Sequence, residues 1–256
     1  MMNLKTAVYT SDKEDKELLS RVDDAVNLSS LRHKPVFLGF LNEREQYIIS
    51  EYLSYSPCEI SSYGGYEGAQ RKIISFSEYP LEKEDFPVKA LYFKFRDKDK
   101  LSHRDFLGSL MSLGIERSFV GDIIVNDGAA VCFIKNDIAP YVESQISKIG
   151  RVGVRIVSES ECDIDFVKDT EVLSVIASSM RLDVIVAALT GLSRDKTSKL
   201  IISGKVFVNY AETKNVSHFL KINDILTIRG SGKFVIKDQL GQTKKGRLKI
   251  NIEHYR

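Results

Sequence analysis

The sequence predicts an α+β protein built from three modules, over residues 1–80, 86–160 and 180–256. The chain has 256 residues, 43% of them hydrophobic and 28% charged, which suits a globular protein of two or three domains. Helical and strand periodicities alternate along it. The segment from residue 180 onward contains fifteen Lys and Arg but six Asp and Glu, although the whole chain has a formal net charge of only +2. A mildly acidic body is therefore joined to a basic module suited to a polyanion.

The first module is predicted to be a small α+β unit. Ser11 and Glu14 have the spacing of a capping box at the start of an amphipathic helix over 11–30. The following elements are a buried strand over 35–41, a helix over 43–53, and two strands around a glycine-rich turn over 59–76. A charged joint over 80–87 then leads to the middle module.

The middle module shows a strand–helix–strand–strand–helix–strand pattern. Its predicted elements are a strand over 88–95, a helix over 103–113 capped by Ser102 with Asp105, strands over 122–125 and 129–134, a helix over 138–149, and a strand over 152–157. This order is the ferredoxin-like arrangement of many RNA-binding modules. Alanines stand where an RNA-recognition motif has stacking aromatics, which argues against base stacking on this sheet. Residues 158–171, with six acids, are predicted to be a solvated joint.

The basic module opens with two predicted helices. Leu182, Ile185, Val186 and Leu189 repeat at helical spacing until Gly191. Ser193 is the predicted cap of a second helix, which Gly204 ends before the strand segment KVFVN. We expect the free N–H groups of this helix and its basic side chains to converge near one end, as a phosphate-binding surface.

Individual basic residues also have simpler interpretations. The helix macrodipole disfavours a cation such as Arg181 in a first turn by about 0.3–1 kcal/mol, so a partner is expected there. That partner is RNA or, alternatively, an ion pair with Asp183 or Asp195. Each lysine taken singly fits a solvated surface, and only the cluster argues for RNA.

Two stretches carry a family resemblance. RLDVIVAALTGLSRDKTSKLIISGKVFVNY and KINDILTIRGSGKF resemble the S4 RNA-binding domain of the alpha-L type, over about residues 180–235. GGYEGAQRK (64–72) and LSHRDFLGSLMSLGIERSFVGDI (101–123) resemble hallmark stretches of the bacterial YlmH family. Gln70 departs from that pattern, where an acidic residue is expected. The resemblance implies a cytoplasmic, ribosome-associated RNA-binding protein, linked to rescue of stalled large subunits that still hold peptidyl-tRNA and, in some bacteria, to cell division.

The resemblance and the charge pattern together give a set of RNA-binding candidates. In the basic module they are Arg181, Ser193, Arg194, Lys196, Lys199, Lys205, Asn209, Arg229 and Lys233. In the first two modules they are Arg71 and Lys72 beside the glycine-rich turn, and His103 and Arg104 at the start of a capped helix.

The sequence also argues against several kinds of functional site. The three cysteines are far apart, the histidines have no metal-ligand spacing, and no set of residues suggests a nucleophile with its base. We therefore expect no metal, no cofactor, no small-molecule substrate and no membrane segment. The favoured hypothesis is a non-enzymatic protein that binds ribosomal RNA, and also tRNA, on the large ribosomal subunit. The alternatives are an RNA-modifying enzyme, since Arg181-Leu182-Asp183 resembles a pseudouridine synthase motif, and a division-site interaction protein.

Overall fold

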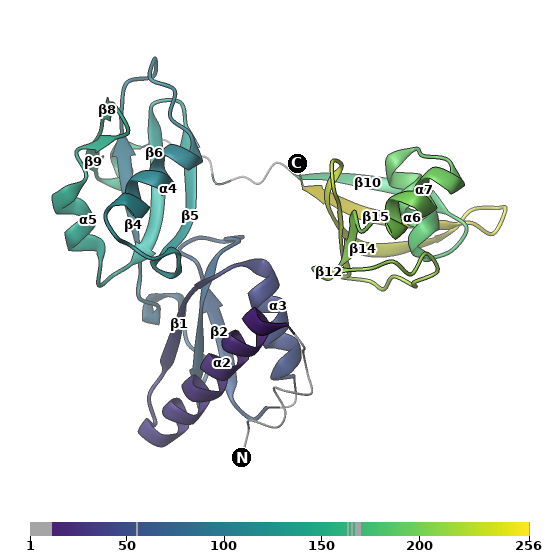
Figure 1. Ribbon diagram of the computed structural model, residues 1–256, viewed down its shortest axis with the longest axis horizontal. Helices are drawn as coiled ribbons and strands as arrows, with labels where there is room; N and C mark the ends of the chain where they lie inside the picture. The colour runs from purple at the N-terminus through teal and green to yellow at the C-terminus, as the bar shows by residue number, and fades with distance from the viewer. Residues whose placement is uncertain (1–11, 55, 163, 165, 167–169, 256) are drawn as a thin grey trace. The chain divides into compact units, whose positions relative to one another are not determined.

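The computed structural model describes residues 12–54, 56–162, 164, 166 and 170–255 (Figure 1). The chain divides into two compact units, Met1–Phe166 and Val167–Arg256, which are described separately below. Both units combine helices with antiparallel sheets, which confirms the predicted α+β class. Within the described residues, no helix has both the length and the apolar character needed to cross a membrane.

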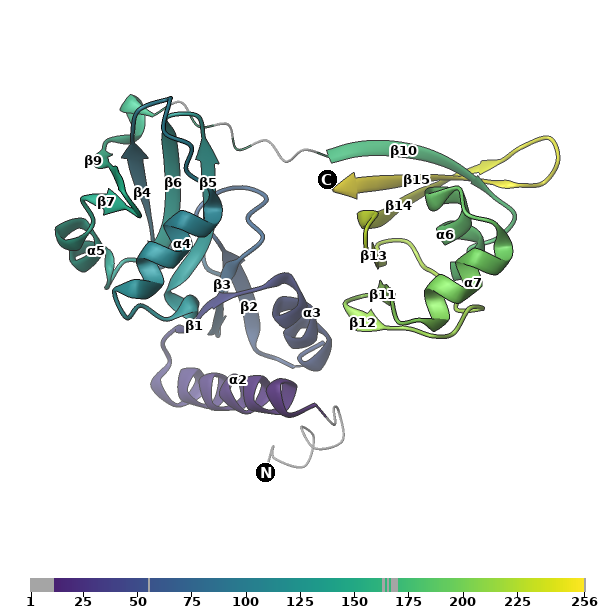
Figure 2. The same ribbon diagram turned by 45° about the horizontal axis from the view of Figure 1, so that its top comes forward.

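Unit 1 begins with a three-stranded sheet covered by two helices. Its elements are α2 (Lys13–Arg32), β1 (Val36–Leu41), α3 (Glu43–Tyr52), β2 (Glu59–Tyr63) and β3 (Lys72–Ser77). The antiparallel strand order is β1-β3-β2, and α2 and α3 pack on one face around Val22, Ile49 and Phe76 (Figure 2). The predicted cap Ser11 lies outside the described residues. Asp12 caps α2, because its side chain accepts the Glu14 N–H at 2.9 Å.

A second, four-stranded sheet follows in the same unit. Its elements are η1 (Lys83–Asp85), β4 (Val88–Lys94), α4 (His103–Ser112), η2 (Arg117–Phe119), β5 (Val120–Asn126), β6 (Ala129–Lys135), α5 (Ala139–Gln145) and β9 (Arg155–Val157). The antiparallel order β5-β6-β4-β9 places β4 and β6 in the centre. Helices α4 and α5 pack against one face around Phe93, Phe106 and Val142. The order of strands and helices is the one that the sequence predicts.

The predicted helix over 138–149 is too long. It ends as α5 at Gln145, and β7 (Lys148–Ile149) then pairs with β8 (Val152–Gly153) across Gly150, whose φ is 56°. The predicted strand over 152–157 is accordingly split into β8 and β9. Val142, Ile146 and Ile149 are buried at helical spacing, so periodicity alone could not separate a helix from a helix followed by a hairpin.

The middle of the other face of the four-stranded sheet is buried against the first sheet. Phe133 of β6, 1% exposed, stacks on Tyr66 from the glycine-rich loop with ring centroids 5.0 Å apart. Phe166 packs against both rings at 5.3 and 6.2 Å, so the predicted solvated joint over 158–171 contributes to the core. An RNA-recognition motif stacks bases on this face. In this protein Phe133 on that face is covered by Tyr66, so bases cannot stack there.

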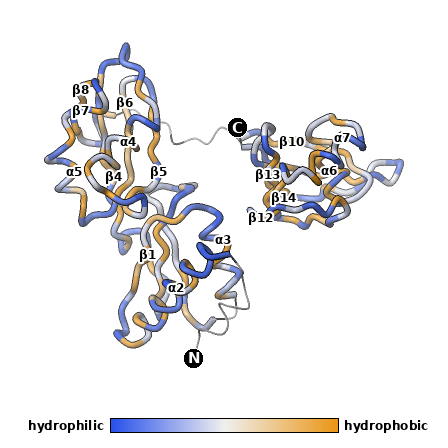
Figure 3. Tube along the Cα trace, in the orientation of Figure 1, coloured by the Kyte–Doolittle hydropathy of each residue, from blue (hydrophilic) through white to orange (hydrophobic). Residues whose placement is uncertain are grey.

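Unit 2 is a six-stranded antiparallel sheet with two helices on one face (Figures 1 and 2). Its elements are β10 (Thr170–Ala177), α6 (Leu182–Thr190), α7 (Arg194–Ile202), β11 (Val206–Val208), β12 (Ala211–Glu212), β13 (Ile225–Ile228), β14 (Gly232–Gln242) and β15 (Leu248–Tyr255). Ile185, Ile201 and Ile250 lie in its core. Strand β10 pairs with β15 from Thr170 onward, so this unit starts before residue 180. The tip of the β14–β15 hairpin is hydrophilic (Figure 3).

Candidate nucleic-acid interface

Helix α7 carries the predicted basic residues at its two ends rather than at one. Arg194 and Lys196 lie in the first turn and Lys199 in the last turn, and all three side chains are exposed. Nine residues at 1.5 Å each give a helix roughly 13 Å long. We therefore describe two basic groups, one at each end of α7, and their convergence on phosphate stays a prediction.

Ser193 has the backbone conformation of an N-cap, but its side chain makes no capping hydrogen bond. The sequence predicted that this hydroxyl holds the helix end, and the structure contradicts that. The first-turn N–H groups of α7 are thus left uncapped by Ser193, with Arg194 and Lys196 beside them. An exposed acid, Asp195, shares this turn and offsets part of the positive charge.

Arg181 is held by an ion pair. Its Nε and Nη2 donate to Asp183 Oδ1 and Oδ2, both at 3.0 Å, and Asp183 is 5% exposed. The Arg181 hydrogen bond is the largest cause that lowers the pKa of Asp183, and the Arg194 cation adds to it. Arg194 and Asp183 line one hollow of about 330 Å³. The structure therefore gathers Arg181, Asp183 and Arg194 at the start of both helices, with the ion-pair alternative realised for Arg181.

The start of α6 is closed to a ligand. The N–H groups of Leu182 and Asp183 donate to the carbonyls of His218 and Val216 at 2.7 and 3.2 Å. Among the described residues, no loop carbonyl is seen to accept a hydrogen bond from the first-turn N–H groups of α7. Helix α7 is therefore the better anion-facing end of the two.

The second basic group lies where the chain leaves α7. Lys205 precedes β11, and its carbonyl accepts the Arg229 N–H at 2.9 Å. The Arg229 guanidinium lies over the Phe207 ring at 5.2 Å, and Lys233 Nζ lies over the Tyr255 ring at 4.5 Å. Cross-strand pairing aligns Phe207, Thr227, Lys233 and Tyr255 in one row on the sheet face away from the helices.

Asn209 has a structural role in this unit. It takes a left-handed conformation with φ of 49°. Its Nδ2 donates to Asp224 at 2.9 Å and its Oδ1 accepts the Ile225 N–H at 2.9 Å. These bonds tie the turn between β11 and β12 to the start of β13, which gives Asn209 a structural role, and its RNA contact stays a prediction.

In unit 1, His103 and Arg104 are exposed in the first turn of α4, as predicted. Asp105 accepts hydrogen bonds from the Ser102 N–H at 2.8 Å and from its Oγ at 2.7 Å, which confirms the predicted cap of Ser102 with Asp105. Partial desolvation of the imidazole and the nearby Arg117 cation lower the pKa of His103.

Arg71 braces the two sheets of unit 1. Its Nη2 donates to the Phe40 carbonyl at 2.7 Å and its Nε donates to the Val120 carbonyl at 3.1 Å. Both carbonyls lie at register irregularities, of β1 and of β5. The structure therefore gives the Arg71 guanidinium a structural role, and its RNA contact stays a prediction. Lys72 is half-buried at the start of β3.

Two residues beside Arg71 were missed by the sequence analysis. Arg117 Nη1 also donates to the Val120 carbonyl and, at 3.1 Å, to that of Gly121. Burial and the Arg71 cation lower the pKa of Arg117 to about 10. The Asp122 carboxylate accepts the N–H groups of Gln70 and Arg71, at 2.6 and 3.0 Å, and the Tyr66 hydroxyl at 2.9 Å. Only their place within a hallmark stretch could have marked Arg117 and Asp122.

Two comparisons of the sequence with known proteins found similar ones. Residues 81–163 match a family model described as "Putative RNA-binding domain in YlmH". The chain is 30% identical over 246 residues to the ribosome-associated protein quality control protein P2 of Bacillus subtilis, covering 94% of this chain and 95% of the relative.

A solved structure adds evidence on the fold alone. The cell division protein ylmH from Streptococcus pneumoniae is 22% identical and aligns with a TM-score of 0.51, over 61% of this chain and 98% of its own. The identity over nearly the full length of the Bacillus relative, together with the domain match, confirms the family that the sequence suggested: the chain belongs to the YlmH family.

Proposed function

We propose that this protein is a non-enzymatic RNA-binding protein of the cytoplasm that binds ribosomal RNA on the large subunit. In this proposal tRNA on the same subunit is a second ligand, and the protein acts in rescue of stalled ribosomal complexes. A link to cell division is carried over from the name of the Streptococcus structure. Support for the RNA and ribosome parts comes from the RNA-binding description of the matched domain and from the ribosome-associated relative.

The observation that carries the proposal is the start of α7. Its N-cap side chain leaves the first-turn N–H groups uncapped, and the exposed Arg194 and Lys196 flank them. Backbone N–H groups and cations at a helix start are the combination that binds phosphate. Lys199, Lys205 and Arg229 extend the positive surface toward the other end of the helix, which suits an extended polyanion. An S4-type domain is our interpretation of unit 2.

The position of Asp183 favours the non-enzymatic reading. In the pseudouridine synthase alternative an aspartate in this motif is the nucleophile. Here Asp183 is buried at the start of α6 with both carboxylate oxygens bonded to Arg181. Incubation with ribosomal RNA should therefore leave the number of pseudouridines unchanged. Pseudouridine-specific chemical labelling checks this, since the modification does not change the mass. New label at a defined site would instead favour the enzyme.

The RNA-binding test uses the double variant Arg194→Gln/Lys196→Gln in the full chain. Its affinity for isolated large subunits should fall, and the slope of log affinity against log salt should shrink by roughly 0.7–0.9 per lost phosphate contact. The melting temperature should stay unchanged, because both side chains are exposed.

The control is Lys89→Gln/Lys100→Gln, which makes the same change in net charge in unit 1. Both control lysines are ion-paired, with Glu143 at 2.7 Å and Asp127 at 3.0 Å. The control should bind like the wild type. Equal slopes for the wild type and the Arg194/Lys196 variant would mean that the start of α7 is an ordinary solvated surface.

A further inference from the structure

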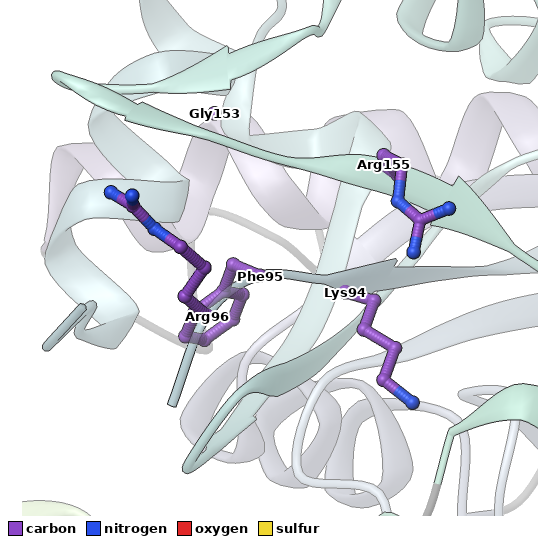
Figure 4. A pocket seen from close by; sticks show the side chains of 5 residues that line it. All are labelled: Lys94, Phe95, Arg96, Gly153 and Arg155. Atoms are coloured by element: carbon purple, nitrogen blue, oxygen red, sulfur yellow. The ribbon is translucent and has the colours of Figure 1, made fainter. Parts of the chain in front are cut away.

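A pocket of about 540 Å³ lies at the β4–β9 edge of the four-stranded sheet, and none of the RNA-contact candidates named above lines it. Its lining residues are Lys94, Phe95, Arg96, Gly153 and Arg155 (Figure 4). All five lie within the segment that matches the family's RNA-binding model. The middle of the sheet face that RNA-recognition motifs use is buried in this protein, so an RNA-binding role of the segment needs a part of its surface that stays exposed, such as the β4–β9 edge.

Two cations of this pocket stand directly opposite each other. Lys94 of β4 pairs in register with Arg155 of the edge strand β9, so both side chains project from the same face (Figure 4). Phe93 and Phe95 point into the core beneath the helices, which places Lys94 on the other side. Like charges directly opposite in an antiparallel pair are destabilising. A bound anion would relieve that cost.

The charges around the pair are only partly balanced. Lys94 Nζ donates one hydrogen bond, to the Glu161 carbonyl at 3.2 Å, and an ammonium has three donors. Arg155 has no side-chain hydrogen bond or ion pair within the described chain. Arg96 is already paired with Asp99, at 2.7 and 3.2 Å.

The Glu161 carboxylate interacts electrostatically with both cations. It accepts hydrogen bonds from the Ser158 N–H at 3.2 Å and from Ser158 Oγ at 2.9 Å. Those bonds are the main cause that lowers its pKa, and Arg155 and Lys94 add smaller contributions. Its carboxylate is therefore anchored on Ser158, and it weakens the positive field at the pocket.

Gly153 contributes no side chain to the lining of the pocket. A Cβ atom built there would meet no atom within 4 Å, so packing does not demand a glycine at this position. A side chain placed on Gly153 would have room there and would add to the lining of the pocket that Lys94 and Arg155 share.

We propose that Lys94 and Arg155 form a binding site for a backbone phosphate of RNA, at the β4–β9 edge of the RNA-binding segment. The site rests on the proposed function and deepens it, because it gives unit 1 its own RNA contact in addition to that of unit 2. Arg155 supplies a planar fork for two phosphate oxygens and Lys94 supplies a point charge. No base is read there, so the contact positions the RNA without selecting its sequence.

The test measures binding of the full chain to a structured ribosomal RNA hairpin and to isolated large subunits across a salt series. Lys94→Gln/Arg155→Gln should bind more weakly, with a slope smaller by roughly 0.7–0.9 per lost contact. Gly153→Glu should weaken binding without removing a cation. Glu161→Gln, which keeps an oxygen that can accept from Ser158, should tighten it. Lys89→Gln/Lys100→Gln, with one residue on the same strand β4, is the charge-matched control and should bind like the wild type.

The outcomes separate the two proposals. A wild-type chain that binds neither probe would overturn the proposed function and this site together. Wild-type binding that Arg194→Gln/Lys196→Gln weakens, but that Lys94→Gln/Arg155→Gln leaves unchanged in affinity and slope, would overturn this site alone. Binding of inorganic phosphate that depends on Lys94 and Arg155, with RNA binding unaffected, would assign the pocket to a free anion and also overturn it.

Discussion

Replacing Arg71 with alanine should destabilise unit 1 without acting on RNA directly. The Phe40 carbonyl would lose its guanidinium donor at a register irregularity of β1. The Val120 carbonyl would lose one of two donors and keep Arg117. An unpaired buried carbonyl costs about 1–3 kcal/mol and a hydrogen bond to a charged group contributes about 1.5–3 kcal/mol. Since the site is only half-buried, we expect a total loss of about 2–4 kcal/mol.

That loss should be visible as a shift in melting temperature. At roughly 2–4 °C per kcal/mol for a unit of this size, the transition of unit 1 should move down by about 4–16 °C. Calorimetry of the full chain measures the shift, and amide hydrogen exchange of β4 and β6 assigns it to unit 1. Arg71→Lys should lose much of the same stability, because an ammonium keeps the charge but cannot span both carbonyls as the planar fork does.

Arg104→Ala is the matched control, an exposed arginine of the same unit, and should leave the melting temperature unchanged. Arg71→Ala with wild-type stability and a reduced salt slope of RNA binding would refute the structural role and restore the RNA contact that the sequence suggested.

Three further predictions concern unit 2. Ser193→Ala should lower the free energy of unfolding by less than about 0.5 kcal/mol in denaturant titrations, since its hydroxyl makes no cap bond, and a loss near 2 kcal/mol would contradict this. Asn209→Ala should cost about 1–3 kcal/mol in the same assay, because it removes the donor to Asp224 Oδ1 and the acceptor of the Ile225 N–H, and a neutral result would show that other contacts hold the turn. The Arg181 pair lowers the pKa of Asp183, so its stabilisation is present at neutral pH and is lost as pH falls through and below about 4. Arg181→Gln should flatten the fall of unfolding free energy over that range, and an unchanged pH profile would contradict the pairing.

Local pattern was enough for much of the architecture. The apolar spacing around Leu18 and Val22, the glycine stops at Gly191 and Gly204, and the capping acid Asp105 each act within a few residues of chain. Such signals predicted the helices α2–α7 and most strands of unit 1, whereas of the strands of unit 2 they predicted β11 alone. They failed over 138–149, where a hairpin keeps the same apolar residues buried as a longer helix would.

The sequence by itself determined the mixed fold class, the basic character of the C-terminal part and the YlmH family. Only the tertiary structure decided what each polar side chain does. Arg71 meets the carbonyls of Phe40 and Val120, and Asn209 meets Asp224, across separations that no local pattern records. Tyr66 and Phe166 likewise cover Phe133 from distant parts of the chain. A charge or an amide in a motif is compatible with RNA or with the fold, and the choice depends on which backbone groups folding brings within hydrogen-bond distance of it.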